Sequence, residues 1–347
     1  MDHSIPLQVI ERPRDTMARP LRDLRISVID RCNFRCPYCM PEDQFADDAV
    51  FLSKNERLRF EEIERIARAF AGLGVHKLRL TGGEPLLRRD LPQLVRMLRS
   101  IPGVEDLALT TNGVLLPRFA ASLREAGLMR LTVSLDTLDP QTFRQLSGGR
   151  GEVGETLAGI AAAEAAGFGR IKLNCVVMRG VNDAHAIDLL ERFRGTGHIV
   201  RFIEYMDVGT MNHWKRELVV PSAELIARIR RRWPLHALHP NYRGEVAERY
   251  AFSDGGGEIG FISSVSQPFC GDCSRARLSA DGKMYTCLFA REGHDLRTAL
   301  RAGSGDAELA AMIAGHWSRR VDRYSERRAE LRTDGDDRKV EMFTIGG

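Results

Sequence analysis

Three cysteines fall within eight residues in the stretch Cys32-Asn33-Phe34-Arg35-Cys36-Pro37-Tyr38-Cys39. Thiolate sulfur is the preferred ligand of iron–sulfur clusters and also binds zinc, and a short loop can fold three thiolates around one centre. Three ligands are one too few for a closed four-iron cluster or a structural zinc site. A cluster bound here would therefore keep one iron open to a small chelating molecule, with the aromatic Tyr38 beside it.

A second group of three cysteines follows much later in the chain, at Cys270, Cys273 and Cys287. The seventh cysteine, Cys175, stands in an apolar segment, as an inert core thiol does. A zinc loop that took its fourth ligand from elsewhere would need one further cysteine, not three. The division into two triplets therefore favours two clusters, each with an open iron, over zinc.

The CxxxCxxC spacing of the first triplet resembles the signature of the radical S-adenosylmethionine (SAM) superfamily. The resemblance implies that the open iron takes the amino and carboxylate groups of SAM. It also implies that an electron from the cluster breaks the sulfonium bond. The cofactors expected are two 4Fe–4S clusters and SAM.

Composition sets the broad class of the protein. A chain of 347 residues with 43% hydrophobic residues is long enough for one large α/β domain with an appendage. Its first residues lack the apolar core of a secretory signal, and it contains no apolar run long enough for a membrane span. A cytoplasmic location is expected, where clustered cysteines indicate metal or redox chemistry. The net charge of +4 suits a small anionic substrate; a nucleic-acid surface at residues 228–232 is the weaker alternative.

Strand-like and helix-like patterns alternate along the first two thirds of the chain. Strands are predicted at residues 21–29, 77–81, 106–111, 130–135, 171–177 and 199–205, and helices at 60–73, 91–100, 118–126, 152–166 and 184–194. Such alternation predicts parallel βα units closing into a partial, six-stranded, TIM-like (β/α) barrel. We expect a flexible N-terminal arm (1–20), the barrel (21–215), a C-terminal α+β extension carrying the second cluster (216–340) and a tail (341–347).

The C-terminal ends of the predicted strands, where barrels place functional residues, are polar. Those ends read Thr81-Gly82-Gly83-Glu84-Pro85, Thr110-Thr111-Asn112-Gly113, Ser134-Leu135-Asp136 and Glu204-Tyr205-Met206-Asp207. The two glycines would let a ligand approach the backbone closely. Each end taken singly is typical of a turn or a helix N-cap, but together they indicate a polar ligand across the barrel mouth.

Several cations lie within predicted strands, where an unpaired charge is costly. These cations are Arg25, Lys77, Arg79 and Lys172, joined by Arg275 and Arg277 two residues apart after the second triplet. Their partners could be the phosphates of a substrate or an internal carboxylate such as Glu204. The chain ends in Met342-Phe343-Thr344-Ile345-Gly346-Gly347, where apolar residues beside a diglycine indicate a docked segment rather than a frayed end.

Taken together, the motifs CNFRCPYCMP, LTGGEPLLRRD and FCGDCSRARLSADGK, the last followed by Cys287, closely resemble the GTP 3′,8-cyclase (MoaA) family of molybdenum cofactor biosynthesis. The resemblance extends from about residue 20 to Gly347. It implies a lyase in which the 5′-deoxyadenosyl radical takes the ribose C3′ hydrogen of GTP. The C3′ radical then bonds to guanine C8, giving 3′,8-cyclo-7,8-dihydroguanosine triphosphate.

The resemblance also assigns residues. It implies Cys32, Cys36 and Cys39 as ligands of the SAM-cleaving cluster; Cys270, Cys273 and Cys287 as ligands of a substrate-binding cluster; Tyr38, Gly83, Ser134 and Met206 at SAM; Arg25, Lys77, Arg79, Thr110, Lys172, Arg275 and Arg277 at GTP; and Arg25, Gly346 and Gly347 as catalytic residues.

The expected partners are GTP, an external electron donor of flavodoxin or ferredoxin type, and cyclic pyranopterin monophosphate synthase, which receives the product. Neither a nucleic acid nor a membrane is expected, and the oligomeric state, including a homodimer, stays open. The alternatives are another radical SAM enzyme with an auxiliary cluster, such as one that modifies peptides, and a zinc-stabilised nucleic-acid-binding protein.

Overall fold

The computed structural model describes residues 12–45, 49–331 and 339–346, and a single twelve-stranded sheet runs through them. The strand order is β12-β11-β10-β1-β2-β3-β4-β5-β6-β9-β8-β7. The strands are β1 (Asp23–Ser27), β2 (Lys77–Thr81), β3 (Asp106–Thr111), β4 (Arg130–Ser134), β5 (Lys172–Val177), β6 (Ile199–Glu204), β7 (Leu235–Leu238), β8 (Glu248–Phe252), β9 (Glu258–Ile262), β10 (Arg275–Leu278), β11 (Lys283–Tyr285) and β12 (His294–Asp295).

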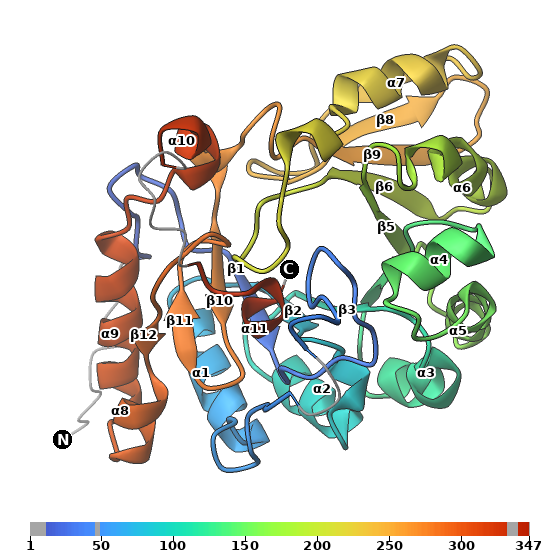
Figure 1. Ribbon diagram of the computed structural model, residues 1–347. Coiled ribbons are helices and arrows are strands. Elements are labelled where there is room, and N and C mark those ends of the chain that lie inside the picture. The colour runs from blue at the N-terminus through green and yellow to red at the C-terminus, as the bar shows by residue number, and fades with distance from the viewer. Residues whose placement is uncertain (1–11, 46–48, 332–338, 347) are drawn as a thin grey trace.

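The helices lie mainly on the outer face of the curved sheet (Figure 1). They are α1 (Phe60–Gly72), α2 (Leu91–Arg99), α3 (Leu116–Glu125), α4 (Pro140–Leu146), α5 (Val153–Ala165), α6 (Ala186–Phe193), α7 (Ser222–Arg230), α8 (Arg297–Arg301), α9 (Asp306–Ser318), α10 (Tyr324–Leu331) and α11 (Met342–Ile345). Unlike the others, α11 lies over the inner side of the sheet near β1 and β2, close to the C-terminus.

Strands β1 to β6 are parallel neighbours, which confirms the predicted six-stranded partial barrel. Successive side chains of β1 point to opposite faces of the sheet: Leu24 and Ile26 are fully buried in the core, and Arg25 lines the inner cavity. The helices cover the outer face with apolar stripes. In α1, for example, Ile63, Ile66 and Phe70 are buried.

The C-terminal extension continues the barrel sheet at both of its edges. Strand β9 pairs in parallel with β6 and carries β8 and β7 antiparallel, whereas β10 pairs in parallel with β1 and carries β11 and β12 antiparallel. The chain therefore crosses from one edge of the barrel to the other between β9 and β10. That crossing brings the second cysteine triplet beside the first strand.

Parts of the described structure differ from the sequence-based expectation. Helix α4 and the short strands β7, β8, β11 and β12 were not predicted. Within the predicted flexible arm, residues 12–20 are described and pack onto the C-terminal region, because Asp15 and Arg19 are buried and Trp317 Nε1 donates to the Arg19 carbonyl. No helix in the described ranges is long and apolar enough to cross a membrane.

Candidate active site

The first cysteine triplet lies in the loop that follows β1, and a buried arginine holds this loop from within. Arg35 donates from Nη1 to the Cys32 carbonyl (2.9 Å) and from Nε to the Phe45 carbonyl (2.6 Å). The Cys39 amide donates to the Cys36 carbonyl (2.9 Å), which closes a tight turn between these two thiols. The loop is thus fixed by its own backbone and Arg35, and its three thiols are only partly buried.

Gly82 and Gly83 pack directly against this loop. The Gly83 amide donates to the Ile29 carbonyl and the Glu84 amide to the Arg31 carbonyl, both at 2.8 Å. A Cβ at Gly82 would lie 2.4 Å from the Ile29 oxygen, and one at Gly83 would lie 2.2 Å from the Arg31 oxygen. The two glycines therefore let the cysteine loop approach the end of β2, a reason beyond the ligand access expected from sequence.

The same loop forms one wall of a cavity at the C-terminal ends of the strands. This cavity is lined by Cys32, Cys36, Tyr38, Cys39, Gly83, Ser134 and Met206, among others, so every residue assigned from sequence to the first cluster and SAM faces it. The Tyr38 hydroxyl donates to Asp136 Oδ2 (2.6 Å), and the Val176 amide donates to Asp136 Oδ1 (2.8 Å). Burial raises the pKa of Asp136 to about 6. The Asp136 carboxylate thereby fixes the ring that stands between two of the thiols.

A second cavity adjoins the first and shares Thr110, Asn174, Ile203, Met206 and Met342 with it. It is lined by the second triplet, Cys270, Cys273 and Cys287, together with all seven residues assigned from sequence to GTP, namely Arg25, Lys77, Arg79, Thr110, Lys172, Arg275 and Arg277. The two triplets therefore open onto neighbouring cavities. Residues of β3, β5 and the segment after β6 form the shared wall.

Three arginines form a row across the strands that line the second cavity. Arg25 pairs in register with Arg277 of β10 on one side and with Arg79 of β2 on the other. Burial and then the charges of Arg277, Arg79 and Arg275 lower the pKa of Arg25, and burial first of all lowers the pKa of Arg79 and of Arg277 to about 10. All three remain protonated at neutral pH, so the row is a strong attractor for an anion.

Arg79 and Arg25 of this row differ in their hydrogen-bond partners. Arg79 donates from Nη1 to Thr110 and Thr132, both at 3.0 Å. The guanidinium of Arg25 has no hydrogen bond or ion pair with any residue in the described ranges. Neither Arg79 nor Arg25 forms an ion pair within the described ranges, and the nearby carboxylate of Asp23 only partly offsets their charges, so both fit a site for an anionic ligand.

Lys77 and Lys172 extend this positive lining in different ways. Lys77 Nζ lies 3.6 Å from Asp23 and 3.9 Å from Asp106 and donates to the Tyr242 hydroxyl (2.6 Å), so protein groups already neutralise it. Burial and then the charge of Arg201 lower the pKa of Lys172 to about 7. Lys172 is thus the cation of this cavity whose charge is most sensitive to a bound anion.

Glu204, an anionic partner considered from sequence, does not serve these cations. Its carboxylate instead accepts from the backbone amides of Ser222, Val265 and Ser266, each at 2.8 Å, and is buried at the end of β6. Glu204 is therefore excluded as the partner, because it satisfies backbone donors that loops bring to the strand end. This favours the other alternative, the phosphates of a substrate, for the cavity cations.

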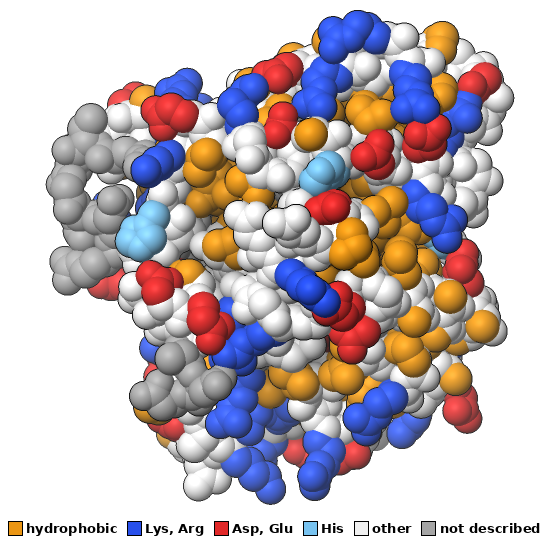
Figure 2. Space-filling model, turned by 45° about the vertical axis from the view of Figure 1, so that its right-hand side comes forward, with side chains coloured by type: hydrophobic (Ala, Val, Ile, Leu, Met, Phe, Trp, Pro, Cys, Tyr) orange, Lys and Arg blue, Asp and Glu red, His pale blue; other side chains and the backbone are white. Residues whose placement is uncertain are grey.

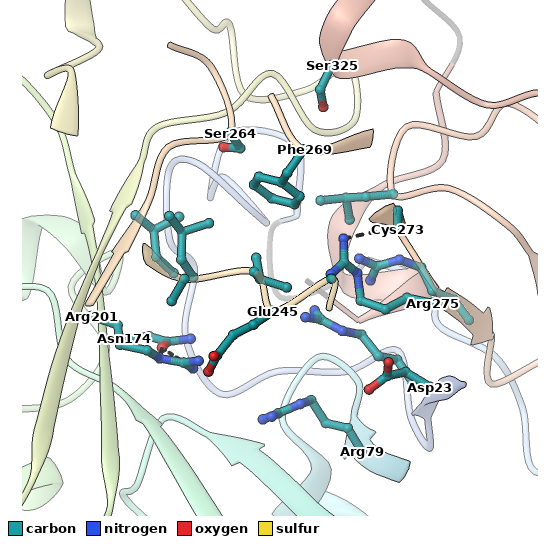
Figure 3. Close-up of a pocket in the computed structure, with 18 of the residues that line it drawn as sticks. Asp23, Arg79, Asn174, Arg201, Glu245, Ser264, Phe269, Cys273, Arg275 and Ser325 are labelled. Atoms are coloured by element: carbon teal, nitrogen blue, oxygen red, sulfur yellow. Dashed lines mark hydrogen bonds between the residues drawn. The ribbon is translucent and has the colours of Figure 1, made fainter. Parts of the chain in front are cut away.

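Sequence reasoning missed Arg201. In Figure 3, Arg79, Arg201 and Arg275 reach into the cavity from different strands, and Arg201 bonds Asn174 Oδ1 through Nε (3.0 Å) and Nη2 (2.6 Å). Burial and then Arg79 lower the pKa of Arg201 to about 9. Arg201 lies within a predicted strand, so the criterion that identified Arg25 and Arg79 would also have found it.

The thiols suit a cationic iron–sulfur centre. Burial and then the Cys32 and Cys39 thiols raise the pKa of Cys36, so the three sulfurs of the first loop lie close enough to oppose one another's ionisation. At the second triplet, burial raises the pKa of Cys273, but Arg275 and Arg320 outweigh it and bring the pKa to about 6; Arg275 Nη2 donates to the Cys273 sulfur (3.2 Å). Grouped thiols with amide and guanidinium donors are the donor set of a cluster.

The C-terminal tail enters between the two cavities. Met342 lines both, Phe343 lines the first, and Ile345 is fully buried. The Gly346 carbonyl accepts a hydrogen bond from Arg277 Nη1, and the chain at Gly346 has a φ of +70°. The tail is thus docked as far as Gly346; Gly347, its expected partner in catalysis, lies outside the described residues.

Comparisons with known proteins identify two families within the chain. Residues 26–193 match the radical SAM superfamily, and residues 198–326 match the family described as Molybdenum Cofactor Synthesis C. Among solved structures, SuiB of Streptococcus suis bound to S-adenosylmethionine superposes with a TM-score of 0.57 at 16% identity, over 85% of this chain and 68% of that one. This likeness supports the radical SAM fold.

Curated relatives match nearly the full chain. A GTP 3′,8-cyclase of Xanthomonas axonopodis pv. citri is 60% identical over 96% of this chain and 98% of the relative. A GTP 3′,8-cyclase of Acidothermus cellulolyticus is 55% identical over 96% and 99%, and one of Staphylococcus carnosus is 46% identical over 98% and 100%. The resemblance inferred from sequence motifs is confirmed: this chain belongs to the GTP 3′,8-cyclase family of radical SAM enzymes.

Proposed function

We propose that this chain is a radical SAM lyase that converts GTP to 3′,8-cyclo-7,8-dihydroguanosine triphosphate, in the pathway to the molybdenum cofactor. The observation that carries the proposal is the row Arg277–Arg25–Arg79 in a cavity that lies between two cysteine triplets. A triphosphate supplies the multiple negative charges that such a row requires. The family membership supplies the reaction class.

In the first cavity, Cys32, Cys36 and Cys39 hold the SAM-cleaving cluster, and Tyr38, Gly83, Ser134 and Met206 surround SAM. When bound, the cluster supplies the electron that cleaves the sulfonium of SAM, which yields the radical that takes the C3′ hydrogen of GTP. Asp136 holds the Tyr38 hydroxyl at 2.6 Å, so the ring keeps a fixed position beside SAM. Met206 and Thr110, which line both cavities, stand at the boundary that the radical must cross.

In the second cavity, Cys270, Cys273 and Cys287 would hold a second cluster, whose open iron would supply a binding site for the guanine. Arg25, Arg79, Lys172, Arg275 and Arg277 bind the triphosphate, with Thr110 and Lys77 at the edge of this group. These cations act on atoms remote from C3′ and C8, so their binding energy positions the ribose without taking part in bond making. Arg25, Gly346 and Gly347 take the catalytic role that the family resemblance assigns to them, and Met342 of the docked tail lines both cavities.

The reaction requires partners beyond GTP. A one-electron donor of flavodoxin or ferredoxin type reduces the first cluster. The product passes to a cyclic pyranopterin monophosphate synthase. A homodimer is compatible with this function, although a single chain forms both cavities.

The test is anaerobic purification and reconstitution with iron and sulfide, followed by incubation with SAM, dithionite and GTP. We expect about eight irons per chain and absorbance at about 400 nm from four-iron clusters. We also expect 5′-deoxyadenosine and a nucleotide with the mass of GTP in which the aromatic H8 signal of guanine is replaced by that of a proton on a tetrahedral carbon. A colourless zinc protein would overturn the proposal and favour the nucleic-acid-binding alternative. SAM cleavage that GTP leaves unchanged, with no cyclised nucleotide, would favour a different radical SAM substrate such as a peptide.

A further inference from the structure

Two buried arginines from outside the cysteine motif hold the backbone of the second cysteine triplet. Arg19 Nη1 donates to the Cys270 carbonyl (2.7 Å), and Arg320 Nη1 donates to the Cys273 carbonyl (2.6 Å). The two arginines come from opposite ends of the chain: one precedes β1, and the other follows α9. Their side chains are only 1% and 2% exposed.

A single carboxylate links the two arginines. Asp15 Oδ2 accepts from Arg19 Nε (2.5 Å) and lies 3.4 Å from Arg320 Nη1, and the Asp15 side chain is fully buried. The Asp15 Oδ1 also accepts from the Met17 and Arg19 amides, both at 2.9 Å, so the segment before β1 is folded around this carboxylate. Thr16 Oγ1 donates to the Arg320 carbonyl (2.7 Å), which joins the two chain segments a second time.

The buried part of this network contains more positive than negative charge. Asp15 is shared by both arginines, and the second carboxylate, Asp322, is 31% exposed where it meets Arg320 Nε at 3.3 Å. Water screens that partly exposed carboxylate more than it screens the buried charges. The buried side of the network therefore carries excess positive charge next to Cys270 and Cys273. An uncompensated buried cation is costly unless an anion lies nearby.

We propose that Arg19 and Arg320, clamped by Asp15, are positioning residues that hold the second cysteine triplet and raise the reduction potential of its cluster. The proposal rests on the proposed function, because it takes the second triplet to hold a four-iron cluster. Each arginine fixes a ligand carbonyl, and its positive charge stabilises the more negative, reduced form of the cluster. The segment at residues 15–19, which the sequence assigned to a flexible arm, is then part of the active site's support.

The first triplet offers a matched control. Arg35 is buried as well and donates to the Cys32 carbonyl (2.9 Å), just as Arg320 donates to that of Cys273. Replacing either arginine by methionine removes one charge and the contact with one cysteine carbonyl at one triplet; Arg35→Met also removes the bonds of Arg35 to the Phe34 and Phe45 carbonyls. Any general loss of folding would affect both clusters alike.

The experiment measures the midpoint potentials of both clusters in the reconstituted full-length protein by redox titration followed by electron paramagnetic resonance. We expect Arg320→Met to lower the potential of the second cluster, Asp15→Asn to raise it, and Arg320→Lys, which keeps the charge, to restore most of it. The first cluster should keep its potential in these variants and change in Arg35→Met. The opposite signs of Arg320→Met and Asp15→Asn separate an electrostatic role from mere disruption.

Iron content gives a second readout if a variant binds its cluster poorly. A drop from about eight to about four irons per chain in Arg320→Met, but not in Arg320→Lys, supports the positioning role. Unchanged potentials of the second cluster in both Arg320→Met and Asp15→Asn would overturn it. A second triplet that holds no four-iron cluster in the unmodified protein would instead overturn the proposed function, and that outcome appears before any variant is made.

Discussion

The guanidinium of Arg277 donates a hydrogen bond to the carbonyl oxygen of Gly346, which ties the C-terminal tail to the row of arginines in the second cavity. Arg277 is only 5% exposed and also lies 3.3 Å from the Ile345 carbonyl oxygen. Under the proposed function, a substrate phosphate would meet the tail at this same side chain. The position of Gly346 would then be coupled to the occupancy of the cavity.

Gly346→Ala should displace the tail. A Cβ at Gly346 would lie 2.0 Å from Thr81 Cγ2, and the φ of +70° disfavours any residue with a Cβ. We expect 5′-deoxyadenosine to form while the yield of cyclised nucleotide per SAM cleaved falls, which product analysis measures. Deleting Gly346 and Gly347 should give the same result with both clusters and GTP affinity largely intact.

Thr81→Ser provides the control for this prediction. Serine lacks the methyl group that the new Cβ would meet, so the double variant Thr81→Ser, Gly346→Ala should recover part of the lost product. Full cyclisation by the truncated chain would show the tail to be dispensable.

Arg25→Met should make the protein without ligand more stable and weaken GTP binding. Arg25 has no hydrogen-bond or ion-pair partner in the described ranges and faces like charges at Arg277 and Arg79, so its removal relieves repulsion. We expect a gain on the order of 1 kcal/mol in the free energy of unfolding of the apoprotein. The loss of GTP affinity should be roughly tenfold to a hundredfold, and guanosine affinity should change much less.

The matched control is Arg130→Met. Arg130 Nε donates to Asp106 Oδ1 (2.7 Å), so its removal breaks an ion pair and should destabilise the apoprotein. Thermal unfolding and calorimetric titration with GTP and guanosine measure both effects. Equal losses of GTP and guanosine affinity in Arg25→Met would count against a phosphate contact.

The barrel strands could be predicted closely from the sequence because strand-like and helix-like patterns alternate regularly along this part of the chain. Lys77–Thr81 and Asp106–Thr111, for example, were predicted with the observed bounds. Prediction from the sequence failed at the edges: β7, β8, β11 and β12 are short strands whose pairing depends on neighbours distant in the chain. Local propensity carries little of that information.

The site residues were predictable where motifs contain them, and all those assigned to the two clusters, SAM and GTP line one of the two cavities. The pairing of Asp15 with Arg320 could not be predicted from the sequence, because no local pattern relates residues about 300 positions apart. Nor could the sequence reveal that Glu204 faces the backbone amides of Ser222 and Val265, since loop packing decides that contact.

The two cysteine triplets should divide the reaction. Cys36→Ala should abolish reductive SAM cleavage, since no electron then reaches the sulfonium. Cys273→Ala should leave SAM cleavage detectable and abolish cyclisation, because Cys273 lines only the second of the two cavities. Assays of 5′-deoxyadenosine and of the cyclised nucleotide separate these outcomes. Equal loss of SAM cleavage in both variants, with the first cluster and the fold intact, would contradict the division.

GTP affinity should fall as the pH rises above about 7, and Lys172 should be the cause. Burial and then the charge of Arg201 lower the pKa of Lys172 to about 7 in the empty cavity, and a bound phosphate would raise it again. Protonated Lys172 favours the anion, so affinity is greatest below pH 7 and declines between that pH and the higher pKa of the complex. Binding at pH 8 should accordingly take up protons, which calorimetry in buffers of different ionisation enthalpy measures.

Lys172→Met should bind GTP more weakly at pH 6.5 and lose most of this proton uptake. Lys77→Met should keep the proton uptake, because Asp23 and Asp106 already neutralise Lys77. A wild-type affinity for GTP that stays constant from about pH 6.5 to 8.5 would show that Lys172 does not meet the phosphates.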